Sequence, residues 1–156
     1  MLATAVLDAA RAQGLMIAAA ESCTGGLVSA ALTEIAGASV VFERGFVTYT
    51  DAAKTELLGV RPATLQAHGA VSRAVAEEMV LGVLAASPAD LAISVTGIAG
   101  PGGSAHKPEG RVCYARARRG GTMESWQIEH GALGRGTVRL EATRRALRLL
   151  LEALEG

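Results

Sequence analysis

Apolar residues in the first part of the chain switch between helical and strand-like spacing. Leu2 and Val6 stand at helical spacing ahead of Gly14, which predicts a first helix closed by a glycine. Residues 15–20 form a short, continuous apolar run of the kind found in buried strands. Helical spacing returns over residues 27–36. The pattern therefore predicts helix, strand, turn and helix in that order.

Strand and helix patterns keep alternating through the rest of the chain. Residues 40–50 are rich in β-branched and aromatic residues, which predicts one or two strands. Asp51 is a good N-cap for a short helix over residues 52–58, ended by Gly59 and Pro62, and Ser72 is a good N-cap for a longer helix. The remaining predicted elements are a buried strand, a hairpin and a long amphipathic helix, over residues 91–96, 111–118 with 122–128, and 138–154.

This order of elements predicts the fold class. Strands that alternate with helices favour an α/β fold, a three-layer α/β/α sandwich with a mixed, mostly parallel central sheet. No linker or repeat divides the sequence, so we expect one domain over residues 1–156. Ligands of such folds bind beyond the carboxyl ends of strands. Two glycine-rich turns, at residues 22–26 and 96–103, both follow predicted strands, and we expect them at the same rim of the sheet.

Composition narrows the class of protein further. Half of the residues are hydrophobic but only 3% are aromatic, so the core is expected to consist of Ala, Val, Leu and Ile. The net charge is zero, which disfavours nucleic acid and anionic membranes as partners. The sequence shows no signal peptide and no apolar run long enough to span a membrane. The two cysteines, Cys23 and Cys113, form no CxxC pair. We therefore expect a cytoplasmic protein.

The first glycine-rich turn, Ser22-Cys23-Thr24-Gly25-Gly26, is a candidate site. A strand-to-helix turn offers free backbone N–H groups at the positive end of a helix dipole, which can bind a phosphate or stabilise an oxyanion. Ser22 is a candidate nucleophile. Cys23 is a second candidate, because a helix N-terminus can lower the pKa of a thiol. An alternative is that Thr24 is only the N-cap of the helix and the glycines only permit tight packing.

Lys54 is the second candidate for chemistry. The chain has thirteen arginines but only two lysines, Lys54 and Lys107. Arginine stays protonated in proteins, whereas a desolvated lysine can act as a general base. Tyr49 precedes Lys54 by five residues, and its hydroxyl could join a proton relay. The alternative is a solvated lysine on a short surface helix.

The second glycine-rich turn, residues 96–103, begins at Thr96 and contains four glycines. It matches neither the dinucleotide-binding pattern GxGxxG nor a Walker loop ending in GK[ST]. The three histidines, His68, His106 and His130, lack the spacing of metal ligands. We therefore expect no metal and no cofactor.

Four segments together resemble a known family, the CinA C-terminal domain family. They are AESCTGG at 20–26, FERGFVTY at 42–49, AHGAVS at 67–72 and TGIAGPGG at 96–103. The enzymatic members of the family are nicotinamide mononucleotide deamidases. The resemblance implies a three-layer α/β/α fold, a homodimer and a small nucleotide substrate, hydrolysed at its carboxamide without a metal or cofactor.

The resemblance also implies roles for individual residues. The nucleophilic serine of the family matches Ser22, and its assisting tyrosine and lysine match Tyr49 and Lys54. We expect N–H groups of the first turn to hold the oxyanion, and the second turn with an arginine near the last helix to hold the phosphate. The predicted substrate-binding residues are Thr24, Gly25, Gly26, Thr96, Gly97, Gly100, Gly102, Gly103 and Arg135. The alternative function is a non-enzymatic nucleotide-binding or regulatory module linked to competence or DNA damage.

Overall fold

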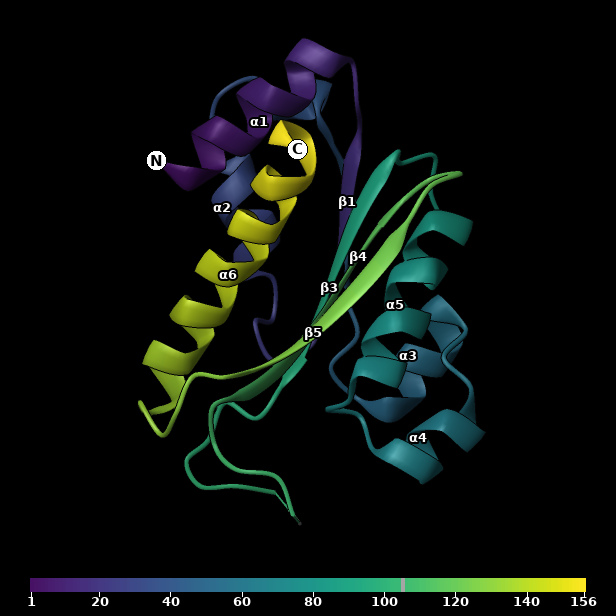
Figure 1. Cartoon of the computed structure of the whole chain (residues 1–156), viewed down its shortest axis with the longest axis vertical. Coiled ribbons are helices and arrows are strands. Elements are labelled where there is room, and N and C mark those ends of the chain that lie inside the picture. The colour runs from purple at the N-terminus through teal and green to yellow at the C-terminus, as the bar shows by residue number, and fades with distance from the viewer. Residues whose placement is uncertain (105) are drawn as a thin grey trace.

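A five-stranded sheet runs through the middle of the protein (Figure 1). The computed structural model describes residues 1–104 and 106–156. The strands lie in the order β2-β1-β3-β4-β5. Strands β2, β1 and β3 pair in parallel, and β3, β4 and β5 pair antiparallel, so the predicted mixed sheet is confirmed. The bounds are β1 (Ile17–Glu21), β2 (Phe42–Val47), β3 (Leu91–Gly97), β4 (Arg111–Arg118) and β5 (Met123–Glu129).

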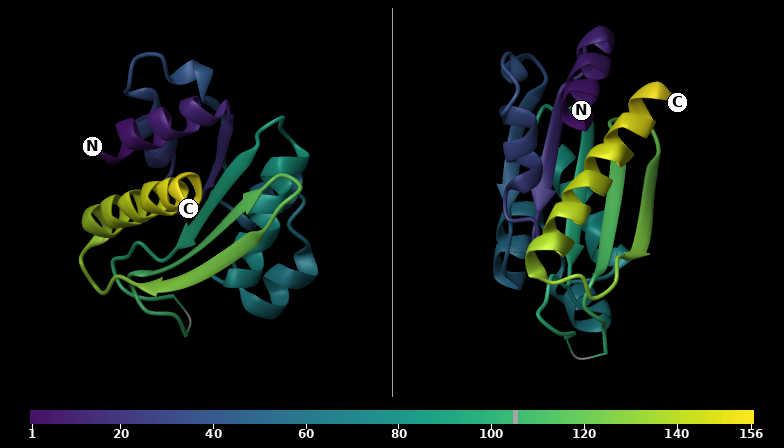
Figure 2. Two further views of the ribbon diagram at one scale, coloured as in Figure 1. Left: turned by 45° about the horizontal axis from the view of Figure 1, so that its top comes forward. Right: turned by 90° about the vertical axis from the view of Figure 1, so that its left-hand side faces the viewer.

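Helices cover both faces of this sheet, which confirms the predicted three layers (Figures 1 and 2). One face carries α1 (Leu2–Gln13), α2 (Leu27–Thr33) and α6 (Arg135–Glu155). The other carries α3 (Asp51–Leu58), α4 (Pro62–His68) and α5 (Arg73–Ala85). A separate apolar core fills each of the two interfaces. Side chains of β1 are buried along its whole length, because β1 lies inside the sheet and is covered on both faces.

Several predicted helix ends are confirmed. Gly14 ends α1 in the left-handed conformation, and its N–H group donates to the carbonyls of Ala10 and Arg11. The Ser72 hydroxyl accepts a hydrogen bond from the Val75 N–H at the start of α5.

Two predictions of element ends were wrong, and one was incomplete. Thr50, not Asp51, caps α3, since its hydroxyl accepts from the Ala53 N–H at 3.1 Å. Pro62 does not only end the preceding helix but also begins α4, where proline suits the first turn because it has no N–H group to satisfy. The strand predicted over residues 40–50 is shorter, because a 3₁₀ turn (Ala38–Val40) precedes β2.

No helix within residues 1–104 and 106–156 has both the length and the apolar character needed to cross a lipid bilayer.

Helix α5 lies close to the end of α3, the helix that carries Lys54. Gly82 of α5 faces the backbone of Leu58 so closely that a Cβ atom there would collide with the Leu58 carbonyl group. A glycine at this position therefore allows the two helices to pack together and hold α3 against the rest of the layer.

Substitution of Gly82 by alanine is expected to lower the free energy of unfolding by about 1–3 kcal/mol, because the added methyl group overpacks this contact. Gly136 of α6 is the matched control, since a Cβ there meets no atom within 4 Å. Gly136→Ala should leave stability unchanged or raise it by up to about 1 kcal/mol, from helix propensity alone. Urea denaturation of both variants measures the difference. Equal stabilities would refute the importance of the α3–α5 contact.

Candidate active site

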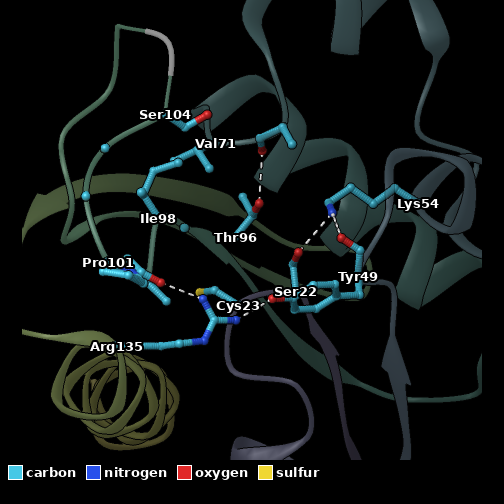
Figure 3. Close-up of a pocket in the computed structure, with 16 residues that line it drawn as sticks. Ser22, Cys23, Tyr49, Lys54, Val71, Thr96, Ile98, Pro101, Ser104 and Arg135 are labelled. Atoms are coloured by element: carbon cyan, nitrogen blue, oxygen red, sulfur yellow. Dashed lines mark hydrogen bonds between the residues drawn. The ribbon is translucent and has the colours of Figure 1, made fainter.

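Both glycine-rich turns lie at one rim of the sheet, as predicted. Strands β1 and β3 are parallel neighbours, with Glu21 beside Val95, so the turns that follow them emerge side by side. A pocket of about 300 Å³ opens between them (Figure 3). Nine of the predicted site residues line it: Ser22, Tyr49, Lys54, Thr96, Gly97, Gly100, Gly102, Gly103 and Arg135. The other three, Thr24, Gly25 and Gly26, belong to the first turn but are outside this lining.

Lys54 and Ser22 meet at the floor of the pocket (Figure 3). The Lys54 Nζ lies 2.9 Å from the Ser22 Oγ, and it donates to the carbonyl oxygens of Thr48 at 3.0 Å and Tyr49 at 3.3 Å. Only 1% of Lys54 is exposed, so the alternative of a solvated surface lysine is wrong. Burial lowers the pKa of the Lys54 amine below its ordinary value, against a smaller opposing effect of the Asp51 charge.

This environment suits a neutral amine that accepts a proton. A neutral lysine has two N–H groups and one lone pair at its nitrogen. In that form the carbonyls of Thr48 and Tyr49 can accept the two N–H groups, and the lone pair can then accept from the third neighbour, the Ser22 hydroxyl 2.9 Å away. The pair therefore has the geometry of a nucleophile and its general base, and no relay through a tyrosine hydroxyl is required.

Cys23, the rival nucleophile, is held in its unreactive form. The residue is buried, and burial raises the pKa of its thiol to about 12, with its own backbone N–H and the Lys54 charge opposing this effect only in part. A thiol of this kind is almost wholly protonated near neutral pH. The expectation that the helix N-terminus activates Cys23 therefore finds no support, and Ser22 is left as the candidate nucleophile of this turn.

Glu21, which sequence reasoning missed, organises the first turn. Its carboxylate is fully buried and accepts five hydrogen bonds at the start of α2. The donors are the Thr24 and Ser29 hydroxyls and the N–H groups of Gly26, Val28 and Ser29. Thr24 is thus not the N-cap of α2. Gly26 occupies that position with φ +107, and a carboxylate from the preceding strand takes over the capping.

The same carboxylate changes what the first turn can bind. The Gly26 N–H donates to Glu21 at 3.2 Å, and the Gly25 N–H donates to the Ser22 carbonyl at 3.0 Å. The prediction that these two N–H groups hold an oxyanion or a phosphate does not fit the structure, because both already have partners within the chain. A glutamate just before a glycine-rich turn was the sequence signal for this arrangement.

The second turn is stabilised in a comparable way. Glu109 accepts from the Gly102 N–H at 2.7 Å with one oxygen and from the Gly134 N–H at 2.9 Å with the other. It thereby ties the loop to the start of α6 and occupies the Gly102 N–H, which we had expected to bind phosphate. Thr96 is buried and donates its hydroxyl to the Ala70 carbonyl at 3.0 Å.

Arg135 and Tyr49 meet at the mouth of the pocket (Figure 3). Arg135 is the first residue of α6 and donates to the Gly100 carbonyl and to the Tyr49 hydroxyl, each at 2.6 Å. Tyr49 is 55% exposed, and its hydrogen bond with Lys54 is made by its backbone carbonyl. The Tyr49 hydroxyl therefore bonds the arginine, while its carbonyl orients the lysine.

Clusters of three or more His, Cys, Asp or Glu side chains that could hold a metal ion do not occur within residues 1–104 and 106–156. His130 instead pairs with the Tyr114 hydroxyl at 2.6 Å, away from the pocket lining.

The known proteins that this chain resembles are similar to it over most of its length. The family model of the CinA C-terminal domain matches residues 1–154. The nicotinamide-nucleotide amidohydrolase PncC of Enterobacter agglomerans is 53% identical over 135 residues, which cover 86% of this chain and 82% of that protein. PncC of Escherichia coli K12 is 48% identical over 151 residues, covering 96% and 90%. The crystal structure of the competence/damage inducible protein CihA from Agrobacterium tumefaciens has 49% identity and a TM-score of 0.95, covering 99% and 94%.

Substitution of Glu21 by glutamine is expected to destabilise the protein by about 1–3 kcal/mol, because the new NH₂ group faces backbone N–H donors and leaves some of them unsatisfied. Urea denaturation measures the effect. Glu34→Gln, which changes an exposed carboxylate at the other end of α2, is the control and should unfold like the parent protein. If Glu21→Gln also matched the parent, the charge at this position would not stabilise the turn.

Proposed function

The chain belongs to the CinA C-terminal domain family and is an amidohydrolase, and from this premise we propose that it deamidates nicotinamide mononucleotide to nicotinate mononucleotide and ammonia. One observation carries the proposal: a buried lysine amine lies 2.9 Å from a serine hydroxyl at the floor of a pocket. Covalent hydrolysis of an amide requires such a nucleophile and base.

The proposed reaction has two stages. In the first, the Ser22 Oγ attacks the carboxamide carbon while its proton passes to the Lys54 Nζ. The lysine then returns the proton to the leaving nitrogen, the C–N bond breaks, and ammonia departs from an acyl-enzyme. In the second stage, water attacks the ester carbon and gives a proton to Lys54. Lys54 passes this proton to the Ser22 Oγ as the ester C–O bond breaks, and the acid product loses its own proton to solvent and leaves as the carboxylate.

The oxyanion of each tetrahedral intermediate needs hydrogen-bond donors. Gly25 and Gly26 are engaged elsewhere, so we assign this role to the N–H group of Cys23, the residue that follows the nucleophile and also lines the pocket. The N–H after a nucleophile commonly stabilises an oxyanion in hydrolases, because it is carried by the same turn.

The mouth of the pocket supports a nucleotide as substrate. Arg135 places a guanidinium there, on the side opposite the floor with Ser22 and Lys54 (Figure 3). Guanidinium groups bind phosphate with paired hydrogen bonds. We propose that Arg135 exchanges its contact with the Gly100 carbonyl for the phosphate, while the Tyr49 hydroxyl holds it in place. The backbones of Gly97, Gly100 and Gly103 let the substrate approach closely.

A purely regulatory nucleotide-binding module explains the pocket less well. Among the residues that the structure describes, the buried Lys54 amine forms no salt bridge. Burying an amine in this way is unfavourable, and a module that only binds a nucleotide does not require it. We further propose a homodimer, from the family premise, and a cytoplasmic protein with one domain over residues 1–156, from the sequence pattern. Light scattering during gel filtration would reveal the oligomeric state.

Ammonia release from nicotinamide mononucleotide tests the function. We expect turnover of the mononucleotide and a kcat/KM at least about 10²-fold lower for nicotinamide riboside, because phosphate binding energy positions the reacting amide. Ser22→Ala should abolish release, whereas the matched Cys23→Ala should retain most of it. No release from the mononucleotide would refute the proposed substrate. Loss of activity in Cys23→Ala alone would refute the serine nucleophile.

Lys54→Arg should be almost as inactive as Lys54→Ala, each at least about 10²-fold below the parent in kcat, because a guanidinium cannot accept the serine proton. Lys107→Arg is the control on the only other lysine and should stay active. In the parent, kcat/KM should fall as the pH falls through the pKa of Lys54, which lies below the ordinary 10.5 and at which the amine becomes charged. Substantial kcat in Lys54→Arg with an unchanged pH profile would show that Lys54 is not the base.

A further inference from the structure

Arg139 of α6 contacts the backbone of the nucleophile turn. Its Nε donates to the Cys23 carbonyl at 3.0 Å, and its Nη2 donates to the Thr24 carbonyl at 3.2 Å, across more than a hundred residues of sequence. The side chain is half-buried, and within residues 1–104 and 106–156 no carboxylate forms a salt bridge with it. The Arg139 guanidinium is therefore held mainly by the backbone carbonyls of Cys23 and Thr24.

Glu21 and Arg139 hold the turn through opposite kinds of group. Glu21 accepts from N–H groups at the start of α2, whereas Arg139 donates to carbonyl oxygens of the two residues after Ser22. A peptide group is planar, so the direction of its carbonyl also sets the direction of the next N–H. Arg139 thus sets the direction of the Thr24 and Gly25 N–H groups. The Gly25 N–H in turn donates to the Ser22 carbonyl at 3.0 Å, and the peptide plane of that carbonyl carries the Cys23 N–H.

The fit of Arg139 against the turn depends on a small residue. A Cβ added at Gly25 would lie 3.3 Å from the Arg139 Nη2, closer than ordinary packing allows. Gly25 also has φ +58, a conformation that glycine adopts without strain. The glycine therefore permits both the turn and the approach of the guanidinium.

Arg139 shares a helix face with Arg135. Residues four apart in a helix lie on one side of it, so the start of α6 presents both guanidinium groups to the site. Arg135 reaches the pocket mouth and Arg139 reaches the turn beneath it. Figure 3 shows the start of α6 beside Arg135 and Cys23.

We propose that Arg139 is a positioning residue for the nucleophile: by binding the carbonyls of Cys23 and Thr24 it holds the Ser22 hydroxyl on Lys54 and the Cys23 N–H toward the pocket. This rests on the proposed role of Ser22. Arg139 does not line the pocket, so it acts through the turn and not on the substrate. Its loss should lower the reactivity of Ser22 and leave substrate affinity nearly unchanged.

Labelling with diisopropyl fluorophosphate tests this without relying on the substrate. The Ser22 Oγ forms a bond to phosphorus, the P–F bond breaks, fluoride leaves and the serine proton passes to Lys54. Intact-protein mass spectrometry gives the rate, with Ser22→Ala as the unlabelled reference. Arg144→Met is the matched control, since Arg144 lies exposed on the same helix and pairs with Glu141.

We expect Arg139→Met to slow labelling, and to lower kcat for nicotinamide mononucleotide, by about 10²-fold with KM changed less than about threefold. Arg139→Lys keeps the charge and should recover part of both rates, and Arg144→Met should match the parent. Melting curves confirm that each variant is folded. If Arg139→Met does not fold, the labelling rate of Arg139→Lys tests the proposal instead. We expect that rate to be at least about threefold below the rate of the parent protein.

Two results would overturn the inference while sparing the proposed function. One is parental labelling and kcat in Arg139→Met, or in Arg139→Lys where only that variant folds. The other is a higher KM with unchanged kcat, which would make Arg139 a substrate contact. A parent protein that neither labels at Ser22 nor releases ammonia would instead refute the nucleophile itself, and this inference with it.

Discussion

The hydrogen bond between Lys54 and Ser22 is the interaction on which the rest of the site depends. It joins the start of α3 to the end of β1, inside a pocket where the lysine is 1% exposed. A buried amine is tolerated only if its hydrogen atoms find acceptors, and the carbonyls of Thr48 and Tyr49 provide them. The chain after β2 must therefore pass over the end of β1, which the parallel pairing of these two strands achieves.

Two carboxylates occupy backbone N–H groups that otherwise make the two glycine-rich turns candidates for anion binding. Glu21 occupies the N–H groups at the start of α2, and Glu109 occupies those of Gly102 and Gly134. An anion supplied by the protein itself satisfies the helix terminus and stiffens the turn. In the proposed reaction, the N–H of Cys23 serves the reacting carbon and the side chain of Arg135 serves the phosphate.

Helix α6 links these parts because its first two turns reach both glycine-rich segments. Gly134 bonds Glu109 of the loop, Arg135 bonds Gly100 and Tyr49, and Arg139 bonds the nucleophile turn. The rest of the helix packs on the sheet with α1 and α2, so its position is set by the apolar core. The apolar packing of most of α6 against the sheet therefore also fixes the positions of the polar groups at the start of the helix.

The sequence by itself determined the layers, the strand and helix order and the rim at which the two turns meet, because these follow from apolar periodicity and short connections. A turn pattern and a rare residue type made Ser22 and Lys54 candidates, and the resemblance to the family supplied their expected roles. Only the tertiary structure decided between alternatives that depend on distance. It buried Lys54 against Ser22, protonated Cys23 by burial, and turned the Tyr49 hydroxyl toward Arg135. It also brought Glu109 and Arg139 to the turns from distant parts of the sequence and directed Glu21 to the start of α2. The partners of a charged residue are known only once the fold is known.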